Sequence, residues 1–386
     1  MLRSLFSGIS GLRAHQQMMD VTGNNIANVN TTGYKSSQTV FQDTLSQMVN
    51  AAGAPQNASG GTNPAQVGLG VRLASINANF GQGAAQTTGK SSDMMIQGDG
   101  FFCVKSGGEE LYTRAGSFTF DANGSLTTPN GQIVQGWTAT DGEVNTAGAP
   151  GNIALPIGVA LAPTTTTEFT LTGNFSYEAP IGTTKEIPIK VIDENGAAQS
   201  LVVTFTKDDA DTWTMSTPDG ATTPLHFTGG KPDDPTATLG DYTVDVHDLT
   251  NYSGLTEARV SNSNGSAAGV LSSYTVSNTG QIVGVFSNGL KQTLGQVALA
   301  NFNNVNGLEK IGDSMFRSTV NSGLAQVGAA GSAGLGLITS GALEMSNVDL
   351  AQEFTNLVIA QRGFQANSRV ITTSDEILQE LVNLKR

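Results

Sequence analysis

The side chains best suited to chemistry are few and scattered along this chain. Its three histidines are His15, His226 and His247, and none stands at the spacing of a metal-binding motif. The one cysteine, Cys103, excludes an intrachain disulfide and a multi-thiolate metal site, and its phenylalanine neighbours predict a buried small side chain. We therefore predict no metal site and no cofactor.

Two other patterns imitate functional motifs but fail on spacing. Asp209 and Asp211 begin like a calcium-binding loop, yet Trp213 stands where an oxygen ligand is needed and Thr214 where glycine is needed. The glycine-rich stretch 328–336 lacks both the lysine of a phosphate-binding loop and the spacing of a dinucleotide fingerprint. The sequence contains no Gly-x-Ser-x-Gly elbow either, and we predict a protein that is not an enzyme.

Charge is concentrated in the middle of the chain. The net charge is −13, and residues 141–260 hold 17 acidic and 5 basic side chains. Because a phosphate-binding face needs clustered Lys and Arg, this balance argues against nucleic acid. We interpret the acidic segment as a solvated surface that keeps copies soluble. No run of about 18 apolar residues predicts a membrane span, and the serines and glycines within 1–12 argue against a signal peptide.

The elements that could organise such a chain are two apolar ladders at its ends, with residues recurring every seventh position and at the three-four offset. The first contains Leu2, Leu5, Ile9, Leu12, Met19 and Ile26, and the second contains Leu350, Phe354, Leu357, Phe364, Ile371, Leu378 and Val382. This spacing predicts helices that pack along a narrow seam. Since chain ends are usually polar and frayed, sticky helical ends indicate a subunit that joins copies of itself.

All twelve prolines lie between Pro55 and Pro235, so neither ladder contains a strong helix breaker. We predict a first helix from about Leu2 to Asn28, weakened by Gly8, Gly11 and Gly23 at about 1 kcal/mol each. A second should begin at a cap on Ser346 or Asn347 and continue to about Leu384. One seam does not offset the entropy of ordering such helices, at about 1–2 kcal/mol per residue, so we expect them to order on assembly.

Between the helices, 47 glycines, many Asn-Gly and Asp-Gly turns and alternating apolar runs predict antiparallel β-structure. The predicted fold class is mainly β with terminal α-helices that pair as a coiled-coil-like inner domain around two nested β domains. The expected parts are a helix at 1–30, a linker or arm at 31–70, a β domain formed by 71–150 and 274–340, an acidic outer β domain at 151–273, and a helix at 341–386.

Several segments resemble bacterial flagellar axial proteins of the rod and hook. Asn24 to Lys35 is similar to the N-terminal signature of that family, in which Asn and Thr can cap the helix end, Gly33 permits a turn and Tyr34 anchors it. Residues 346–384 resemble the family's C-terminal helix, and 97–102, 113–116 and 302–308 match internal pieces. The signature positions are Ala27, Asn28, Thr31, Gly33, Tyr34 and Lys35.

The resemblance implies a subunit exported unfolded through the flagellar type III apparatus, without a cleaved signal peptide, and polymerised outside the cell. The extra segment 151–273 favours a hook subunit, which forms a curved tube and acts as a universal joint. The implied partners are copies of the chain itself, the distal rod protein, the hook–filament junction protein and the hook cap. The alternatives are a distal rod protein and a monomeric extracellular adhesin whose two ladders pair with each other.

Overall fold

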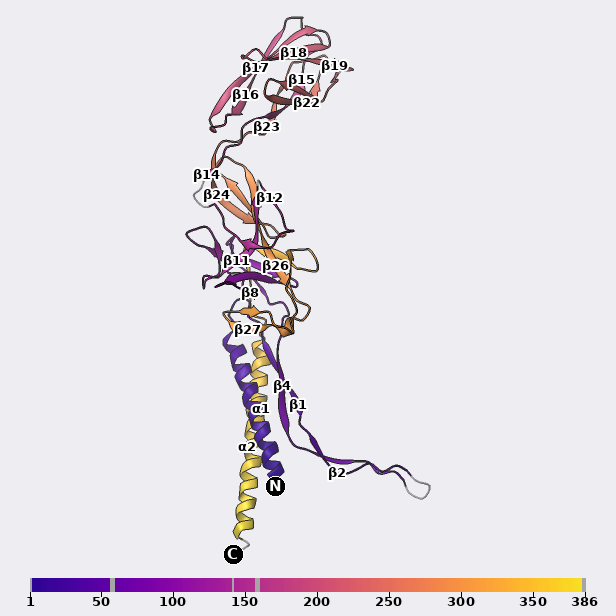
Figure 1. The fold of residues 1–386 in the computed structure, drawn as a ribbon, viewed down its shortest axis with the longest axis vertical. Helices are drawn as coiled ribbons and strands as arrows, with labels where there is room; N and C mark the ends of the chain where they lie inside the picture. The colour runs from indigo at the N-terminus through magenta and orange to yellow at the C-terminus, as the bar shows by residue number, and fades with distance from the viewer. Residues whose placement is uncertain (1, 56–59, 141, 157–159, 384–386) are drawn as a thin grey trace. The chain divides into compact units, whose positions relative to one another are not determined.

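The computed structural model describes residues 2–55, 60–140, 142–156 and 160–383, and these divide into two compact units (Figure 1). Unit 1 comprises Met1–Leu155, Thr275–Val283 and Thr293–Arg386, and unit 2 comprises Pro156–Tyr274 and Gly284–Gln292. The segment 284–292, which we expected in the same β domain as 274–340, therefore falls in unit 2. The chain is mainly β-structure with one long helix towards each end, as the sequence predicted.

Unit 1 contains the two helices, α1 (Leu2–Ala27) and α2 (Leu350–Asn383), which lie side by side (Figure 1). The predicted end of the second helix at Leu384 lies outside the described residues. The predicted cap at Ser346 or Asn347 was wrong by three or two residues, because Asp349 is the residue whose Oδ1 accepts the amide hydrogens of Ala351 and Gln352. No helix in the described part of the chain is long and apolar enough to cross a membrane.

After α1 the chain forms a two-stranded arm rather than an unpaired linker. Strand β1 (Ser37–Asp43) pairs with β4 (Val71–Ala78), and β2 (Ser46–Asn50) pairs with β3 (Ala65–Gly68), all antiparallel. Most side chains of β2 and β3 are exposed. The arm touches α1, where Ser10 Oγ accepts a hydrogen bond from the Val71 amide.

The rest of unit 1 is built on a sheet in which β26, β11, β7, β8, β28 and β27 are successive neighbours. Its strands and the short pairs around it are β5 (Ala85–Thr87), β6 (Met94–Gln97), β7 (Phe101–Ser106), β8 (Glu109–Thr113), β9 (Thr119–Phe120), β10 (Leu126–Thr127), β11 (Ile133–Thr140), β12 (Glu143–Val144), β13 (Gly151–Asn152), β26 (Lys291–Asn301), β27 (Glu309–Gly312), β28 (Met315–Arg317), β29 (Gln326–Ala329), β30 (Leu337–Ser340) and β31 (Ala342–Glu344). A 3-10 helix spans Val305–Gly307.

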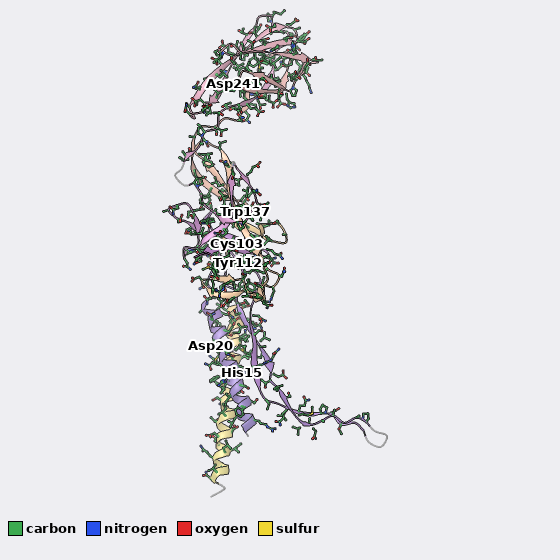
Figure 2. The ribbon with its side chains drawn as sticks, viewed as in Figure 1. His15, Asp20, Cys103, Tyr112, Trp137 and Asp241 are labelled. Atoms are coloured by element: carbon green, nitrogen blue, oxygen red, sulfur yellow. The ribbon has the colours of Figure 1, made fainter. Side chains whose placement is uncertain are left out.

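The core beneath this sheet is aromatic. Cys103, Tyr112 and Trp137 are buried here together with Phe101, Phe302 and Phe316 (Figure 2). Burial raises the pKa of the Cys103 thiol to about 12, so the thiol stays protonated and acts as the small apolar side chain that its neighbours predicted.

Unit 2 contains a four-stranded sheet in the order β21-β22-β15-β23 and a five-stranded sheet in the order β16-β17-β18-β19-β20. Its strands are β14 (Ala160–Leu161), β15 (Glu168–Asn174), β16 (Thr184–Ile192), β17 (Ala198–Asp209), β18 (Thr212–Ser216), β19 (Thr222–Thr228), β20 (Lys231–Pro232), β21 (Thr236–Leu239), β22 (Tyr242–Thr250) and β23 (Arg259–Ser263). Strands β24 (Gly269–Val276) and β25 (Gln281–Phe286) run from one unit into the other.

The prediction of purely antiparallel pairing fails at one place in unit 2. Strand β15 pairs with β22 in parallel, which requires a long connection between them, and the whole five-stranded sheet lies in that connection. Both sheets contribute to one core, which contains Phe169, Phe175, Phe205, Trp213 and Met215.

Candidate functional site

The end of α1 is capped by the asparagines and threonine of the predicted signature. Asn28 Nδ2 donates to the Asn24 carbonyl oxygen at 2.9 Å, and Thr31 Oγ1 donates to Asn28 Oδ1 at 3.0 Å. The Tyr34 hydroxyl donates to Asn25 Oδ1 at 3.2 Å, which ties the following turn back to the helix. Gly33 adopts φ +67°, and a Cβ there would lie 2.4 Å from the Ala115 amide nitrogen, so only glycine fits this turn. Ala27, the remaining small signature residue, is exposed at the last position of the helix.

Lys35 closes the signature with a buried ion pair. Its Nζ lies 2.6 Å from Glu344 Oε1, and neither side chain is exposed to solvent. The same Nζ donates to the Gly81 carbonyl at 2.9 Å, while the Gly83 amide donates to Glu344 Oε1 at 2.9 Å. We call Lys35, Glu344 and the neighbouring Arg114 the junction. It joins the end of α1, the end of the arm and the strand that precedes α2.

Arg114 completes the junction with less ideal geometry. Its Nη1 lies 3.6 Å from Glu344 Oε2 and donates to the Gly98 carbonyl at 2.9 Å. The guanidinium also lies 5.2 Å from the centre of the Phe101 ring, a cation–π contact. Burial lowers the pKa of both Lys35 and Arg114, and the hydrogen bond and charge of Glu344 oppose that shift. One carboxylate therefore balances two buried cations.

A cavity of about 480 Å³ opens beside the junction and is lined by signature residues, including Asn28, Gly33 and Tyr34. Lys310 lies on its wall, where its ammonium donates to the Lys35 carbonyl at 2.9 Å and sits 5.0 Å from the centre of the Tyr34 ring. Among the described residues, no group of His, Cys, Asp and Glu could hold a metal ion. The polar groups of this region serve to fasten segments of the chain together.

The contact between α1 and α2 combines small and polar side chains with the aliphatic side chains of Ile371 and Val370, which approach Gly8. On α1, Gly8, Gly11, Thr22 and Asn25 are buried. Facing them on α2 are the buried Ala360 and Ser374, together with Gly363 and Asn367. A Cβ on Gly11 would lie 2.7 Å from Asn367 Oδ1, and one on Gly363 would lie 2.5 Å from the His15 ring (His15 is labelled in Figure 2). The glycines that weaken α1 locally therefore allow the two backbones to approach closely.

The predicted apolar ladder is only partly covered by this contact, in which Ile371 lies opposite Gly8. Leu5, Leu12, Met19, Ile26, Leu357, Ile371 and Leu378 are partly buried, whereas Ile9, Leu350, Phe354, Phe364 and Val382 are exposed by 38%, 40%, 52%, 37% and 68%. The side chain of Leu2 lies outside the described part of the structure. The helix pair thus leaves much of its apolar surface uncovered within one chain.

Sequence reasoning missed the residues that fasten these elements. Glu344 and Arg114 are far apart in sequence, so nothing local signals their contact, although Arg114 stands in the family-like segment 113–116. Gly8 and Gly11, three positions apart, could have been recognised as small residues on one face of the first helix, and Gly363 as a small residue on the second. Two sites therefore hold these elements of unit 1 together: the junction, and the contact between α1 and α2.

Comparisons with known proteins agree on one class, the axial proteins of the bacterial flagellum. Three family models match the chain: "Flagella basal body rod protein" over 5–35, "Flagellar hook protein FlgE/F/G D1 domain" over 95–160 and "Flagellar basal body rod FlgEFG protein C-terminal" over 339–384. The last two ranges include Arg114 and Glu344, and the first includes Lys35.

Relatives match along the full length. The flagellar hook proteins FlgE of Borreliella burgdorferi and Treponema pallidum are each 37% identical over 100% of both chains. The basal-body rod protein FlgG of Bacillus subtilis is 33% identical over 100% of both chains. The crystal structure of Helicobacter pylori FlgE2 has the same fold over 67% of this chain and 100% of that one, with a TM-score of 0.54 and 14% identity. The chain belongs to the family of flagellar hook and rod proteins.

Proposed function

We propose that this chain is the structural subunit of a bacterial flagellar hook. In this proposal, copies assemble into a curved tube that acts as a universal joint and transmits torque from the rod to the filament. Relatives named as flagellar hook proteins match this chain over its whole length. A contact between copies that is heterologous and does not close produces such a helical polymer.

The observation that carries the proposal is that each helix has one face packed within the chain and another face left partly exposed. One face of each helix, rich in small and polar residues, packs against the partner helix of the same chain. The apolar ladder beside it remains partly exposed, with Phe354 at 52% and Val382 at 68%. Covering such side chains stabilises by roughly 1.5–3 kcal/mol each when burial is complete. Neighbouring copies are the natural cover, so the predicted ladder becomes the assembly seam of the polymer.

The family likeness supports the remaining parts of the proposal. The subunit would leave the cell unfolded through the flagellar type III apparatus, assemble outside it, and meet the distal rod protein, the hook cap and the hook–filament junction protein. The exposed arm of β2 and β3 would contact neighbouring copies. A distal rod protein is the second candidate, because the Bacillus subtilis rod protein matches over its full length.

Electron microscopy of the purified chain under polymerising salt tests the proposal. Curved tubes are the expected result. Short straight rods would favour the rod protein, and dispersed particles would contradict self-assembly and leave the monomeric adhesin.

A substitution on the ladder isolates the seam. Phe354→Ser should change the unfolding free energy of the monomer by less than about 0.5 kcal/mol, because the side chain is half exposed. The same change should abolish or strongly impair tube formation, measured by sedimentation. Gln352→Ser, at an exposed position of the same helix, is the matched control and should polymerise normally. Normal tubes from Phe354→Ser would exclude this residue from the seam.

A further inference from the structure

A buried asparagine side chain holds the root of the arm, the place where its first strand leaves the end of α1. Asn25, on α1, is only 1% exposed. Its Nδ2 donates to the Ser37 carbonyl at 2.8 Å, and its Oδ1 accepts the Ser37 amide hydrogen at 2.9 Å. The side chain therefore pairs with both backbone groups of the first residue of β1, as a neighbouring strand would. The same Nδ2 donates to Glu353 Oε1 on α2 at 3.0 Å, so Asn25 ties the arm to both helices.

A second asparagine holds the same root from the segment that precedes α2. Asn347 Oδ1 accepts the Ser36 amide hydrogen at 2.8 Å, just before β1 begins. Its Nδ2 donates to the carbonyls of Asn79 and Gly81 at 2.7 and 3.0 Å, just after β4 ends. One side chain thus joins the strand that enters the arm to the strand that leaves it. We call Asn25 and Asn347 the clamp.

Both clamp positions require an amide side chain. Each one uses its oxygen as an acceptor and its nitrogen as a donor, whereas the ionised carboxylate of an aspartate only accepts hydrogen bonds. An aspartate in place of Asn25 would lose both donated bonds, and its second oxygen would face the Ser37 carbonyl and the Glu353 carboxylate. A change that leaves the size of the side chain almost unaltered would therefore turn attraction at the root into repulsion.

The far end of the β1–β4 ladder is anchored to α1 as well. There Ser10 Oγ accepts the Val71 amide hydrogen at 3.2 Å, and Val71 pairs with Asp43 at the end of β1. Between Ser10 and Asn25, α1 rises by about 22 Å, and the ladder spans about 20 Å over the same interval. Because the two lengths match, β1 and β4 can lie along α1 between the two anchors (Figure 1).

Beyond this anchor the arm has a different character. Strands β2 and β3 are exposed throughout, and Leu45, Met48 and Val49 are exposed by 84%, 55% and 59%. The chain returns from β3 to β4 through Gly70, whose φ of +123° is readily adopted only by glycine. A Cβ on Gly70 would lie 2.2 Å from Ser10 Oγ, so the same glycine makes room for the anchor. A two-stranded ladder without a packed face is only marginally stable in water.

We infer that the clamp sets the direction of the arm within a single chain. Asn25 and Asn347 are positioning residues that hold β1 and β4 beside α1, and the freedom of the arm to change direction begins at Gly70. Because the direction is fixed in advance, less conformational entropy is lost when the exposed strands β2 and β3 meet a partner. The clamp lies wholly within one chain and would orient the arm in a free subunit, so it does not depend on the proposed self-assembly.

Distances between spin labels in the full-length monomer, measured by pulsed electron paramagnetic resonance, test this inference. One label is attached at Gln17→Cys on α1, and the second at Gln42→Cys on β1 or at Gln47→Cys on β2, all at exposed positions. The native Cys103 is buried and should stay unlabelled. The pair that includes β1 should give a narrow distance distribution, and the pair that includes β2 a broader one. Asn25→Asp with Asn347→Asp, the clamp variant, should widen the first distribution towards the second.

A matched control adds the same charges to the same two helices away from the root. Gln16→Glu with Gln361→Glu, both at exposed positions, should leave the distribution between α1 and β1 narrow. A broad distribution for that pair in the unaltered chain, or a narrow one in the clamp variant, would overturn the inference. Equal widening by the control would do the same, because it would trace the effect to net charge.

A further variant separates the arm from the helices, in case the clamp variant loosens the helix pair itself. Glu353→Gln, added to the clamp variant, supplies an amide that can donate to the new carboxylate at position 25, but the Ser37 carbonyl still lacks its donor. The helical circular dichroism signal at 222 nm should return to its native value while the distribution between α1 and β1 stays broad. If the distribution narrowed together with the return of the helical signal, the helices and not the clamp would set the direction of the arm.

Discussion

The helix pair of unit 1 and the paired sheets of unit 2 bury opposite kinds of side chain. Unit 2 encloses a core that includes Phe175, Phe205 and Trp213, with Phe175 and Trp213 stacked at 4.7 Å between ring centres. The helices bury glycine, alanine, serine, threonine and asparagine against each other and leave apolar residues such as Phe354 exposed. Unit 2 therefore buries its apolar side chains in a core of its own, whereas the helices leave part of theirs exposed.

This difference teaches how a polymer subunit divides its apolar surface. Hydrophobic burial is the dominant favourable term in both folding and association. Side chains in the unit 2 core already stabilise the folded chain, while those on the helix flanks are only partly buried within it. The junction differs from both, because it fixes the helices to the sheet of unit 1 through charge and not through apolar contact.

The largest expected effect comes from emptying the core of unit 2. Trp213→Ala should lower the unfolding free energy of that unit by about 3–5 kcal/mol, because it removes a fully buried aromatic side chain. Denaturant titration followed by Trp137 fluorescence in unit 1 and by circular dichroism for the whole chain would separate the units. If the helical circular dichroism signal were lost at the same lowered denaturant concentration at which unit 2 of the variant unfolds, the comparison would fail. The stability of the helices would then depend on unit 2.

A similar loss, confined to unit 1, should follow from breaking the junction. Glu344→Gln removes the charge that balances Lys35 and Arg114, and should cost about 3 kcal/mol in the unfolding free energy of unit 1. The double variant Glu344→Leu with Lys35→Met removes both partners of the 2.6 Å contact and should be less destabilised than Glu344→Leu alone. Simple addition of the two single effects, measured by denaturant titration, would show that the charges act independently.

A smaller effect is expected where the helices touch. Gly11→Leu should destabilise the helix pair by about 1–3 kcal/mol, because the new side chain meets Asn367. Gly23→Leu is the matched control, since a Cβ there has no neighbour within 4 Å and leucine favours helix over glycine by about 0.5–1 kcal/mol. Thermal unfolding of the helical signal at 222 nm distinguishes them. Equal effects of the two changes would refute close packing at Gly11.

Local patterns predicted the elements well. Two terminal helices and a mainly β chain were predicted from the apolar ladders, the glycine-rich turns and the alternating apolar runs. This succeeded because helix and strand periods are properties of neighbouring residues. The buried thiol of Cys103 followed from its phenylalanine neighbours in the same way. Patterns also suggested that Ser346 or Asn347 caps α2, but the Asn347 Oδ1 accepts the Ser36 amide hydrogen instead, a contact between distant segments.

Contacts across the chain were beyond such reasoning. The parallel pairing of β15 with β22 and the contact of Glu344 with Lys35 depend on how distant segments meet. The spacing predicted that the ladder residues pack against other helices, but it does not say which partner each helix face meets. In this chain Gly8, Gly11 and Gly363 determine which faces of the two helices meet, because their lack of a side chain lets the opposite helix come close.

The Lys35–Glu344 pair also fixes an order of events in time. The two residues are 309 positions apart, so their contact cannot form until nearly nine-tenths of the chain is present in one place. Unit 2 lies between them and can collapse around its own core earlier, because its contacts close shorter loops. The junction therefore requires a much longer loop to close than the contacts inside unit 2 do. A chain cut short before Glu344 would lack the ion pair that ties the end of α1 to the strand preceding α2.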